Sequence, residues 1–145
     1  MTEVTFHFNV PDRLAYACRL LRKATRQGAR VAVTAGSETL SKLDKALWTF
    51  EPNDFVPHVR LPPGATPTQR LLPTPIWLVE QLADAPQRSV ALNLGLEMPQ
   101  GFESFERMIE IVSLGEEDRQ AGRERWKHYT GGGYAITRHE VSDER

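Results

Sequence analysis

The sequence predicts an α/β fold: a single three-layer domain with a mostly parallel (mixed) central sheet and helices on both faces. Stretches with strand periodicity alternate with stretches of helical periodicity in the first fifty residues, which favours a parallel βαβ unit. The chain has 145 residues, of which 40% are hydrophobic and 26% charged, and this suits one globular core. We expect residues 1–141 to form this domain and residues 142–145 to be a polar tail.

A strand and a helix are predicted at the start of the chain. Residues 4–10 alternate between apolar and polar side chains, which predicts a strand with one apolar face. The side chains expected on that face are Val4, Phe6, Phe8 and Val10. Asp12 is a good N-cap for a helix over residues 14–27, and Gly28 suits the residue that ends it. His7 is expected on the polar face, either exposed or hydrogen-bonded.

A second strand and helix follow, and regular structure then becomes sparse. Residues 30–35 predict a buried strand, and Gly36-Ser37 turns the chain into a helix with Ser37 as its N-cap. Seven of the ten prolines fall between residues 52 and 75, where they exclude a long helix or a central strand. The later predicted elements are extended pieces at 55–56 and 76–79, a strand over 89–94, a short helix near 102–105, a strand over 108–112, a helix over 116–130 and a strand over 134–138.

Composition excludes several classes of function. Eighteen Lys and Arg against nineteen Asp and Glu give a formal net charge of -1, so no global field attracts nucleic acid or membrane. The single cysteine, Cys18, rules out an internal disulfide and is expected to be a small buried hydrophobe. No pair among the four histidines has helical metal-site spacing, so we predict neither a metal nor a cofactor. The first residues do not resemble a signal peptide, and no apolar run approaches the ~20 residues that span a bilayer, so we expect a cytoplasmic protein.

Two alternative functions remain open. No P-loop motif occurs, but Gly36-Ser37 lies where phosphates bind in α/β sheets, which would suit a small nucleotide-binding or hydrolytic enzyme. A plain turn is favoured there. The predicted first helix carries a basic stripe, made by Arg19, Arg22, Lys23 and Arg26. A solvated helix face is favoured for this stripe, and direct contact with nucleic acid is the alternative.

The last predicted helix carries a second basic stripe that includes an aromatic residue. Arg119, Arg123 and Lys127 recur every four residues, and Trp126 lies within the same stripe. With Arg125, residues 119–129 hold four basic side chains against one acid. Such a surface suits an acidic peptide with an apolar end, or stacking on a nucleobase. Spacing alone leaves open the alternative that Trp126 packs inward.

An aromatic strip occupies residues 46–58, where the second helix is expected to end. It contains Trp48, Phe50, Phe55 and Val56 among two prolines. Aromatic residues at such a place usually belong to the core, but four apolar groups in so short a run leave some to face a partner.

Three of these stretches and the first strand together resemble the chi subunit family of the bacterial DNA polymerase III holoenzyme. The resemblance covers nearly the whole chain, in the order of its elements and in four stretches: Val4-Thr-Phe-His-Phe8, Leu43-Asp-Lys-Ala-Leu-Trp48, Phe55-Val-Pro-His58 and Arg123-Glu-Arg-Trp-Lys127. Residues 59–75 and the tail after Val141 match poorly, and we infer nothing about them.

The resemblance implies a non-enzymatic adaptor with a nucleotide-binding-like topology but no nucleotide site. It implies that one surface grips the acidic C-terminal tail of single-stranded-DNA-binding protein, through Arg119, Arg123, Trp126 and Lys127. Trp126 stands where the best-known members have Tyr. It implies that a second surface binds the psi subunit of the clamp loader or an accessory helicase, through Trp48, Phe55, Val56, Pro57 and His58. We therefore expect a monomer within a heterodimer, which meets DNA only indirectly.

Overall fold

The computed structural model describes residues 1–50 and 55–141, so the predicted tail at 142–145 lies outside the described residues. Seven strands form one sheet in the order β3-β4-β2-β5-β6-β1-β7. They are β1 (Glu3–Val10), β2 (Val31–Thr34), β3 (His58–Leu61), β4 (Ile76–Val79), β5 (Val90–Asn93), β6 (Arg107–Ser113) and β7 (Ile136–Glu140). The helices are α1 (Arg13–Arg26), α2 (Ser37–Thr49) and α3 (Glu116–Gly131), with 3-10 turns η1 (Gln69–Leu71), η2 (Leu82–Asp84) and η3 (Phe102–Ser104).

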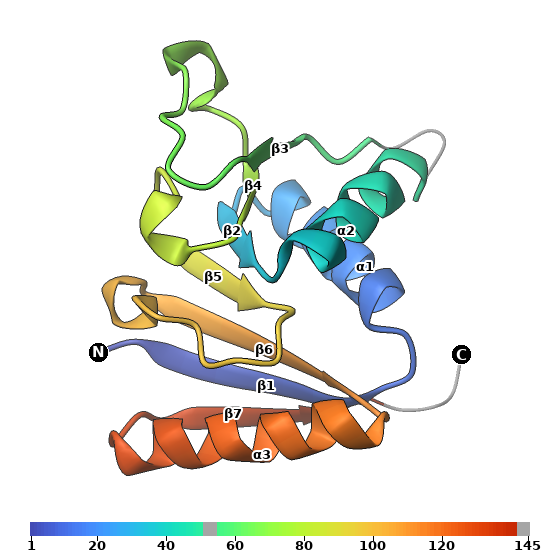
Figure 1. The fold of residues 1–145 in the computed structure, drawn as a ribbon, viewed down its shortest axis with the longest axis vertical. Helices are drawn as coiled ribbons and strands as arrows, with labels where there is room; N and C mark the ends of the chain where they lie inside the picture. The colour runs from blue at the N-terminus through green and yellow to red at the C-terminus, as the bar shows by residue number, and fades with distance from the viewer. Residues whose placement is uncertain (51–54, 142–145) are drawn as a thin grey trace.

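The predicted three-layer α/β fold is confirmed. Helices α1 and α2 cover one face of the sheet, and α3 covers the other (Figure 1). Every described strand pair is parallel, so the sheet is not mixed in this part of the chain. Strands β1 and β2 are separated by β5 and β6, so the two strands of the first predicted βαβ unit are not adjacent in the sheet. None of the described helices is both long and apolar enough to cross a membrane.

Strand β1 departs from the predicted alternation at its end. Asn9 has a φ of 61°, a left-handed conformation that asparagine tolerates better than most residues, and the register with β6 shifts between His7 and Val10. Phe8 therefore stays on the α3 side of the sheet, whereas Val10 joins the core beneath α1. The prediction that Val10 shares a face with Phe8 is wrong.

The start of α2 also differs from the prediction. Gly36, not Ser37, is the N-cap, and no side chain caps this end of the helix. The hydroxyl oxygen of Ser37 instead accepts a hydrogen bond from Arg60 Nη2 at 2.8 Å. At α1 the prediction is confirmed, since Asp12 accepts a hydrogen bond from the amide of Ala15 at 3.2 Å.

Two predicted strands are displaced along the chain. The edge strand β3 spans His58–Leu61 rather than residues 55–56, because it pairs with β4 only from His58 onwards. Strand β7 begins two residues later than predicted. Tyr134 precedes this strand, and its ring centroid lies 5.1 Å from that of Phe102. This contact holds the turn between α3 and β7 in position.

Candidate functional site

Helix α3 lies close against β6 because a glycine faces the strand. A Cβ atom on Gly122 would lie 2.9 Å from Cγ2 of Val112, so a larger residue would push the helix away from the sheet. This approach shapes a groove between α3 and strands β1, β6 and β7, which we call the basic groove.

The basic groove has a volume of about 500 Å³ and combines cations with an apolar floor. Its lining comes from α3 and from strands β1, β6 and β7, and consists of Phe6, Phe8, Asn9, Val112, Ser113, Arg119, Gly122, Arg123, Trp126, Lys127 and Arg138. The structure thus brings together all four residues predicted on the last helix: Arg119, Arg123, Trp126 and Lys127. No acidic side chain is among these lining residues.

Trp126 packs partly inward and also remains partly exposed on the groove side. Its ring packs edge-on against Phe6, with ring centroids 5.1 Å apart and planes at 61°. The indole is only half-buried and also lines the basic groove. Its inner edge therefore anchors α3 to the sheet, while its outer surface is available to a ligand.

Arg125, counted among the four basic residues of 119–129, points into the core and adds no charge to the groove. Its side chain is 2% exposed, and its Nε lies 2.8 Å from Glu110 Oε1 in the core. Tyr129 donates its hydroxyl proton to Glu110 Oε2 at 2.7 Å. Burial and the nearby Glu110 carboxylate raise the pKa of Tyr129, so it remains a donor. The signal that could have shown this is the inward spacing of Asp118, Gly122, Arg125 and Tyr129 along α3.

Arg138 is a groove residue that sequence reasoning missed. It lies on β7, and its guanidinium carbon stands 5.3 Å from the ring centroid of Phe8 and 5.9 Å from that of Trp126. The sequence placed Arg138 on a short strand, but nothing in the pattern showed which face of the sheet it occupies.

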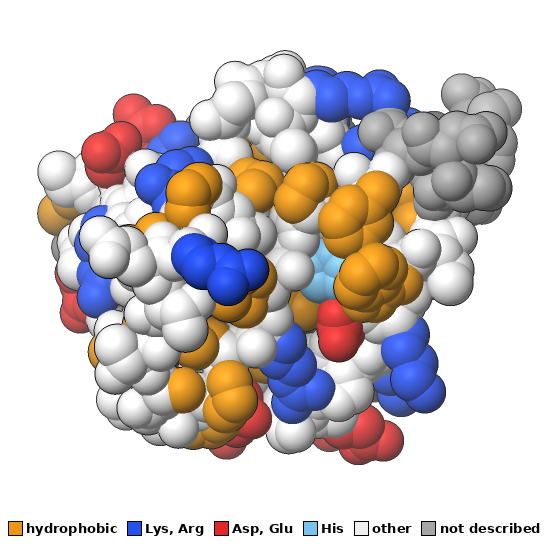
Figure 2. Space-filling view, turned by 90° about the horizontal axis from the view of Figure 1, so that it is seen from above, with side chains coloured by type: hydrophobic (Ala, Val, Ile, Leu, Met, Phe, Trp, Pro, Cys, Tyr) orange, Lys and Arg blue, Asp and Glu red, His pale blue; other side chains and the backbone are white. Residues whose placement is uncertain are grey.

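Three of the predicted partner residues form an exposed aromatic surface, defined here as Trp48, Phe55 and Pro57. The side chain of His58 is only 1% exposed, so His58 supports this surface and does not present its ring to a partner. Trp48 is 63% exposed and Phe55 is 47% exposed, and their ring centroids lie 4.8 Å apart. Figure 2 shows hydrophobic side chains gathered on this face around a histidine. The His58 ring lies 5.5 Å from Trp48 and 5.6 Å from Phe55.

Two further features hold the aromatic surface in place. His58 Nδ1 donates to the carbonyl oxygen of Val56 at 2.7 Å, and His58 Nε2 lies 2.8 Å from Asp44 Oδ1. Val56 is 1% exposed and packs in the core, so it supports this surface from below rather than presenting itself to a partner. Residues 51–54 of the predicted aromatic strip lie outside the described residues.

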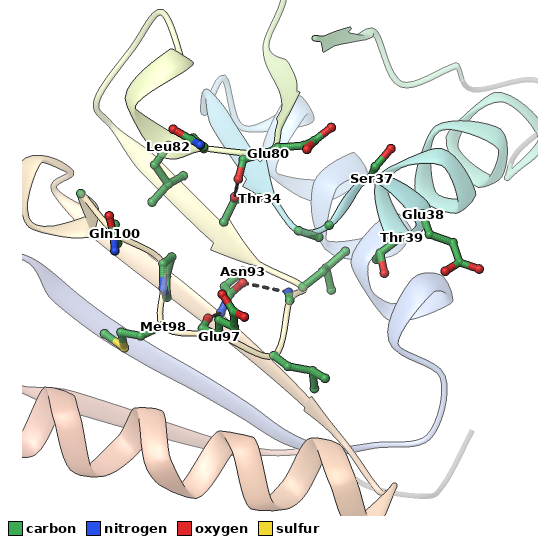
Figure 3. A pocket seen from close by; sticks show the side chains of 18 of the residues that line it. Thr34, Ser37, Glu38, Thr39, Glu80, Leu82, Asn93, Glu97, Met98 and Gln100 are labelled. Atoms are coloured by element: carbon green, nitrogen blue, oxygen red, sulfur yellow. Dashed lines mark hydrogen bonds between the residues drawn. The ribbon is translucent and has the colours of Figure 1, made fainter. Parts of the chain in front are cut away.

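A second cavity, of about 1110 Å³, lies at the carboxyl ends of β2, β4 and β5 and includes Gly36 and Ser37 (Figure 3). This is where α/β sheets commonly bind nucleotides. Its acidic lining residues are Glu38, Glu80, Glu97, Glu117 and Asp118. The one cation in the lining, Arg13, donates to the carbonyl oxygen of Leu94 at 2.7 Å and lies 3.6 Å from Asp118. Phosphate groups would meet mainly carboxylates here, which argues against the nucleotide-binding alternative.

The basic stripe of α1 does not resemble a nucleic-acid site, and the His, Cys, Asp and Glu side chains of the described residues do not form a metal site. The guanidinium groups of Arg19 and Arg22 stack on Tyr16 and Phe50, at 5.8 and 5.2 Å from the ring centroids, which suits a packed helix surface. Within residues 1–50 and 55–141, no group of three or more His, Cys, Asp or Glu side chains could hold a metal ion. Cys18 is buried as predicted, and burial raises the pKa of its thiol to about 11.

Comparison with known proteins assigns the family. The model of the family "DNA polymerase III chi subunit, HolC" matches residues 1–137. The chain belongs to the DNA polymerase III chi subunit family. The match to the chi family runs through residues 59–75, which the sequence resemblance had left out.

Chi subunits from three bacteria are similar to this chain. DNA polymerase III subunit chi of Pseudomonas aeruginosa is 33% identical over 147 residues, covering 97% of this chain and 98% of the relative. The chi subunit of Haemophilus influenzae is 32% identical, and the alignment covers 86% of this chain and 85% of that protein. The chi subunit of Escherichia coli is 26% identical, and the alignment covers 82% of this chain and 79% of that protein.

A solved structure shares the fold alone. The C-terminal domain of Saccharomyces cerevisiae Dbp5, solved bound to Gle1 and IP6, aligns with a TM-score of 0.59 and 14% identity. The alignment covers 99% of this chain and 92% of that domain.

Proposed function

We propose that this chi-family protein is a non-catalytic adaptor of the replication machinery. The basic groove binds the acidic C-terminal tail of single-stranded-DNA-binding protein. The aromatic surface binds a second protein, the psi subunit of the clamp loader or an accessory helicase. Membership of a family of DNA polymerase III subunits supports the replication role.

The composition of the basic groove is the observation that carries the proposal. Arginine pairs with carboxylates through two parallel hydrogen bonds, so a row of cations on α3 suits a run of acidic side chains. Beside this row, the partly exposed rings of Phe8 and Trp126 provide apolar surface for the hydrophobic end of the same peptide, and the buried Phe6 supports them from below. A single-stranded nucleic acid would offer a base to Trp126 and phosphates to the cations, so binding of bare oligonucleotide is measured as the competing outcome in the experiment below.

The positions of the two surfaces support a linking role. The aromatic surface lies at the end of α2 and in the residues just before β3, which is one edge strand of the sheet. The basic groove involves β7, the other edge strand. Two partners bound at opposite edges need not compete, which is what an adaptor requires.

Binding to single-stranded-DNA-binding protein on DNA tests the proposal. We expect the protein to shift a complex of oligonucleotide and full-length binding protein in a native gel, and to leave bare oligonucleotide unshifted. The binding protein lacking its last eight residues serves as the matched control and should not be shifted further. A shift of bare DNA, or an equal shift with the truncated protein, would contradict the adaptor assignment.

A further inference from the structure

The basic groove contains a fourth cation, on the wall opposite α3. We propose that Arg138 pairs with the terminal carboxylate of the bound peptide and so makes the groove selective for a free C-terminus. This inference rests on the proposed function, since it assigns a role within the same site.

The sheet register places Arg138 beside the groove floor. Arg138 pairs with Phe6 in the parallel ladder between β1 and β7, and paired residues project to the same face of a sheet. Phe6 packs toward Trp126 of α3, so Arg138 also projects to that face. The other three cations of the groove stand on the helix, and Arg138 stands on the strand wall.

Arg138 is held in place without using its hydrogen-bonding edge. Its guanidinium lies over the rings of Phe8 and Trp126, at 5.3 and 5.9 Å, and this stacking leaves the N–H groups at the rim free to donate. No ion pair joins Arg138 to an acid within the described parts of the chain. Lys127, in contrast, lies 3.8 Å from Glu124.

The chemistry of a peptide's last residue matches this corner of the groove. An apolar C-terminal residue carries its side chain and its carboxylate on the same Cα, so both must find partners within a few ångströms. Arg138 is the groove cation that stands over two aromatic rings among the described contacts, and it therefore offers both partners together. The cations of α3, one helical turn apart, then face the acidic side chains further back along the peptide.

A two-by-two titration tests the assignment. Wild type and Arg138→Gln are each titrated with a nine-residue acidic peptide ending in Asp-Ile-Pro-Phe, made as a free acid and as a C-terminal amide. Arg138 is exposed, so the variant should fold, and circular dichroism checks this. Arg107→Gln, an exposed arginine at the far end of β6, is the matched control and should bind both peptides as wild type does.

We expect wild type to bind the free acid about tenfold or more tightly than the amide, and Arg138→Gln to bind both peptides with the same weakened affinity. If Arg138→Gln weakens both peptides equally and keeps the preference for the free acid, the pairing with the terminal carboxylate is wrong. If wild type binds neither peptide, the proposed function itself fails. These two failures are therefore distinguishable.

Discussion

At the residue scale, Trp126 packs against the sheet and is proposed to contact the peptide, and substitutions can separate these two roles. Trp126→Ala removes the groove surface and should weaken tail binding by about 2 kcal/mol, as truncation of a buried aromatic anchor does. Trp126→Tyr keeps a ring against Phe6 and should retain most of the affinity. Fluorescence anisotropy with a labelled acidic peptide measures both. Unchanged affinity in Trp126→Ala, with the fold intact, would remove the indole from the site.

His7 is a second residue with a measurable consequence, in this case for stability against acid. Its Nδ1 lies 2.5 Å from the hydroxyl of Tyr16, and burial raises the pKa of Tyr16, which therefore stays protonated and able to donate. Burial, with His139 and Arg107 nearby, lowers the pKa of His7 to about 4 from 6.5. The expected surface or hydrogen-bonded role is thus confirmed as a hydrogen-bonded one.

The lowered pKa predicts a loss of stability on acidification. In the unfolded chain His7 becomes protonated below about pH 6.5, whereas in the folded protein it becomes protonated only near pH 4. The free energy of unfolding should therefore decrease as the pH falls between these two values, and His7→Gln should flatten that part of the curve. Urea denaturation of both proteins at several pH values tests this. Parallel curves would show that His7 does not contribute.

At the scale of elements, α3 is attached to the sheet by a buried ionic network. Glu110 of β6 is fully buried, accepts from Arg125 and Tyr129, and lies 3.1 Å from Asn93 Nδ2. Arg125 also donates from Nη1 to the carbonyl oxygen of Leu96 at 2.6 Å. The helix that presents the basic groove is thereby fixed in rotation and in position.

Removing one partner of this network should be costly. Glu110→Ala leaves the Arg125 charge buried and unpaired, which predicts a loss of about 3–5 kcal/mol in the free energy of unfolding. Glu124→Ala, an exposed acid on the same helix, should change it by less than about 0.5 kcal/mol. Chemical denaturation compares the two. A small effect of Glu110→Ala would mean that water or rearrangement compensates the charge.

At the scale of the whole molecule, the two surfaces should act independently. Trp48→Ala should abolish capture of the second partner and leave binding of the acidic peptide unchanged, because the two surfaces lie at opposite edges of the sheet. Since Trp48 is 63% exposed, the variant should fold with little loss of stability. Co-purification with a psi subunit, beside peptide titration, tests this. Unfolding of Trp48→Ala would instead assign the residue to the core.

The sequence predicts the layers and most elements because local periodicity determines which face of a helix or strand is apolar. It predicts the groove residues of α3 for the same reason, since Arg119, Arg123 and Lys127 share a stripe. It misses features that depend on contacts between distant segments. The burial of Arg125 requires Glu110 from another element, and the face of Arg138 requires the register of β7 on β1.

The most direct test of the account is calorimetric titration of the acidic peptide ending in Asp-Ile-Pro-Phe into wild type, Arg123→Ala and the distant control Arg107→Ala. We predict that wild type and the control bind the peptide, and that Arg123→Ala loses about 2 kcal/mol or more of the binding free energy. Affinity should also fall as salt rises, because ions screen charges beyond about 10 Å at 0.1 M. Absence of binding by folded wild type, or equal affinity of Arg123→Ala, would contradict the assignment of the basic groove as the tail-binding site.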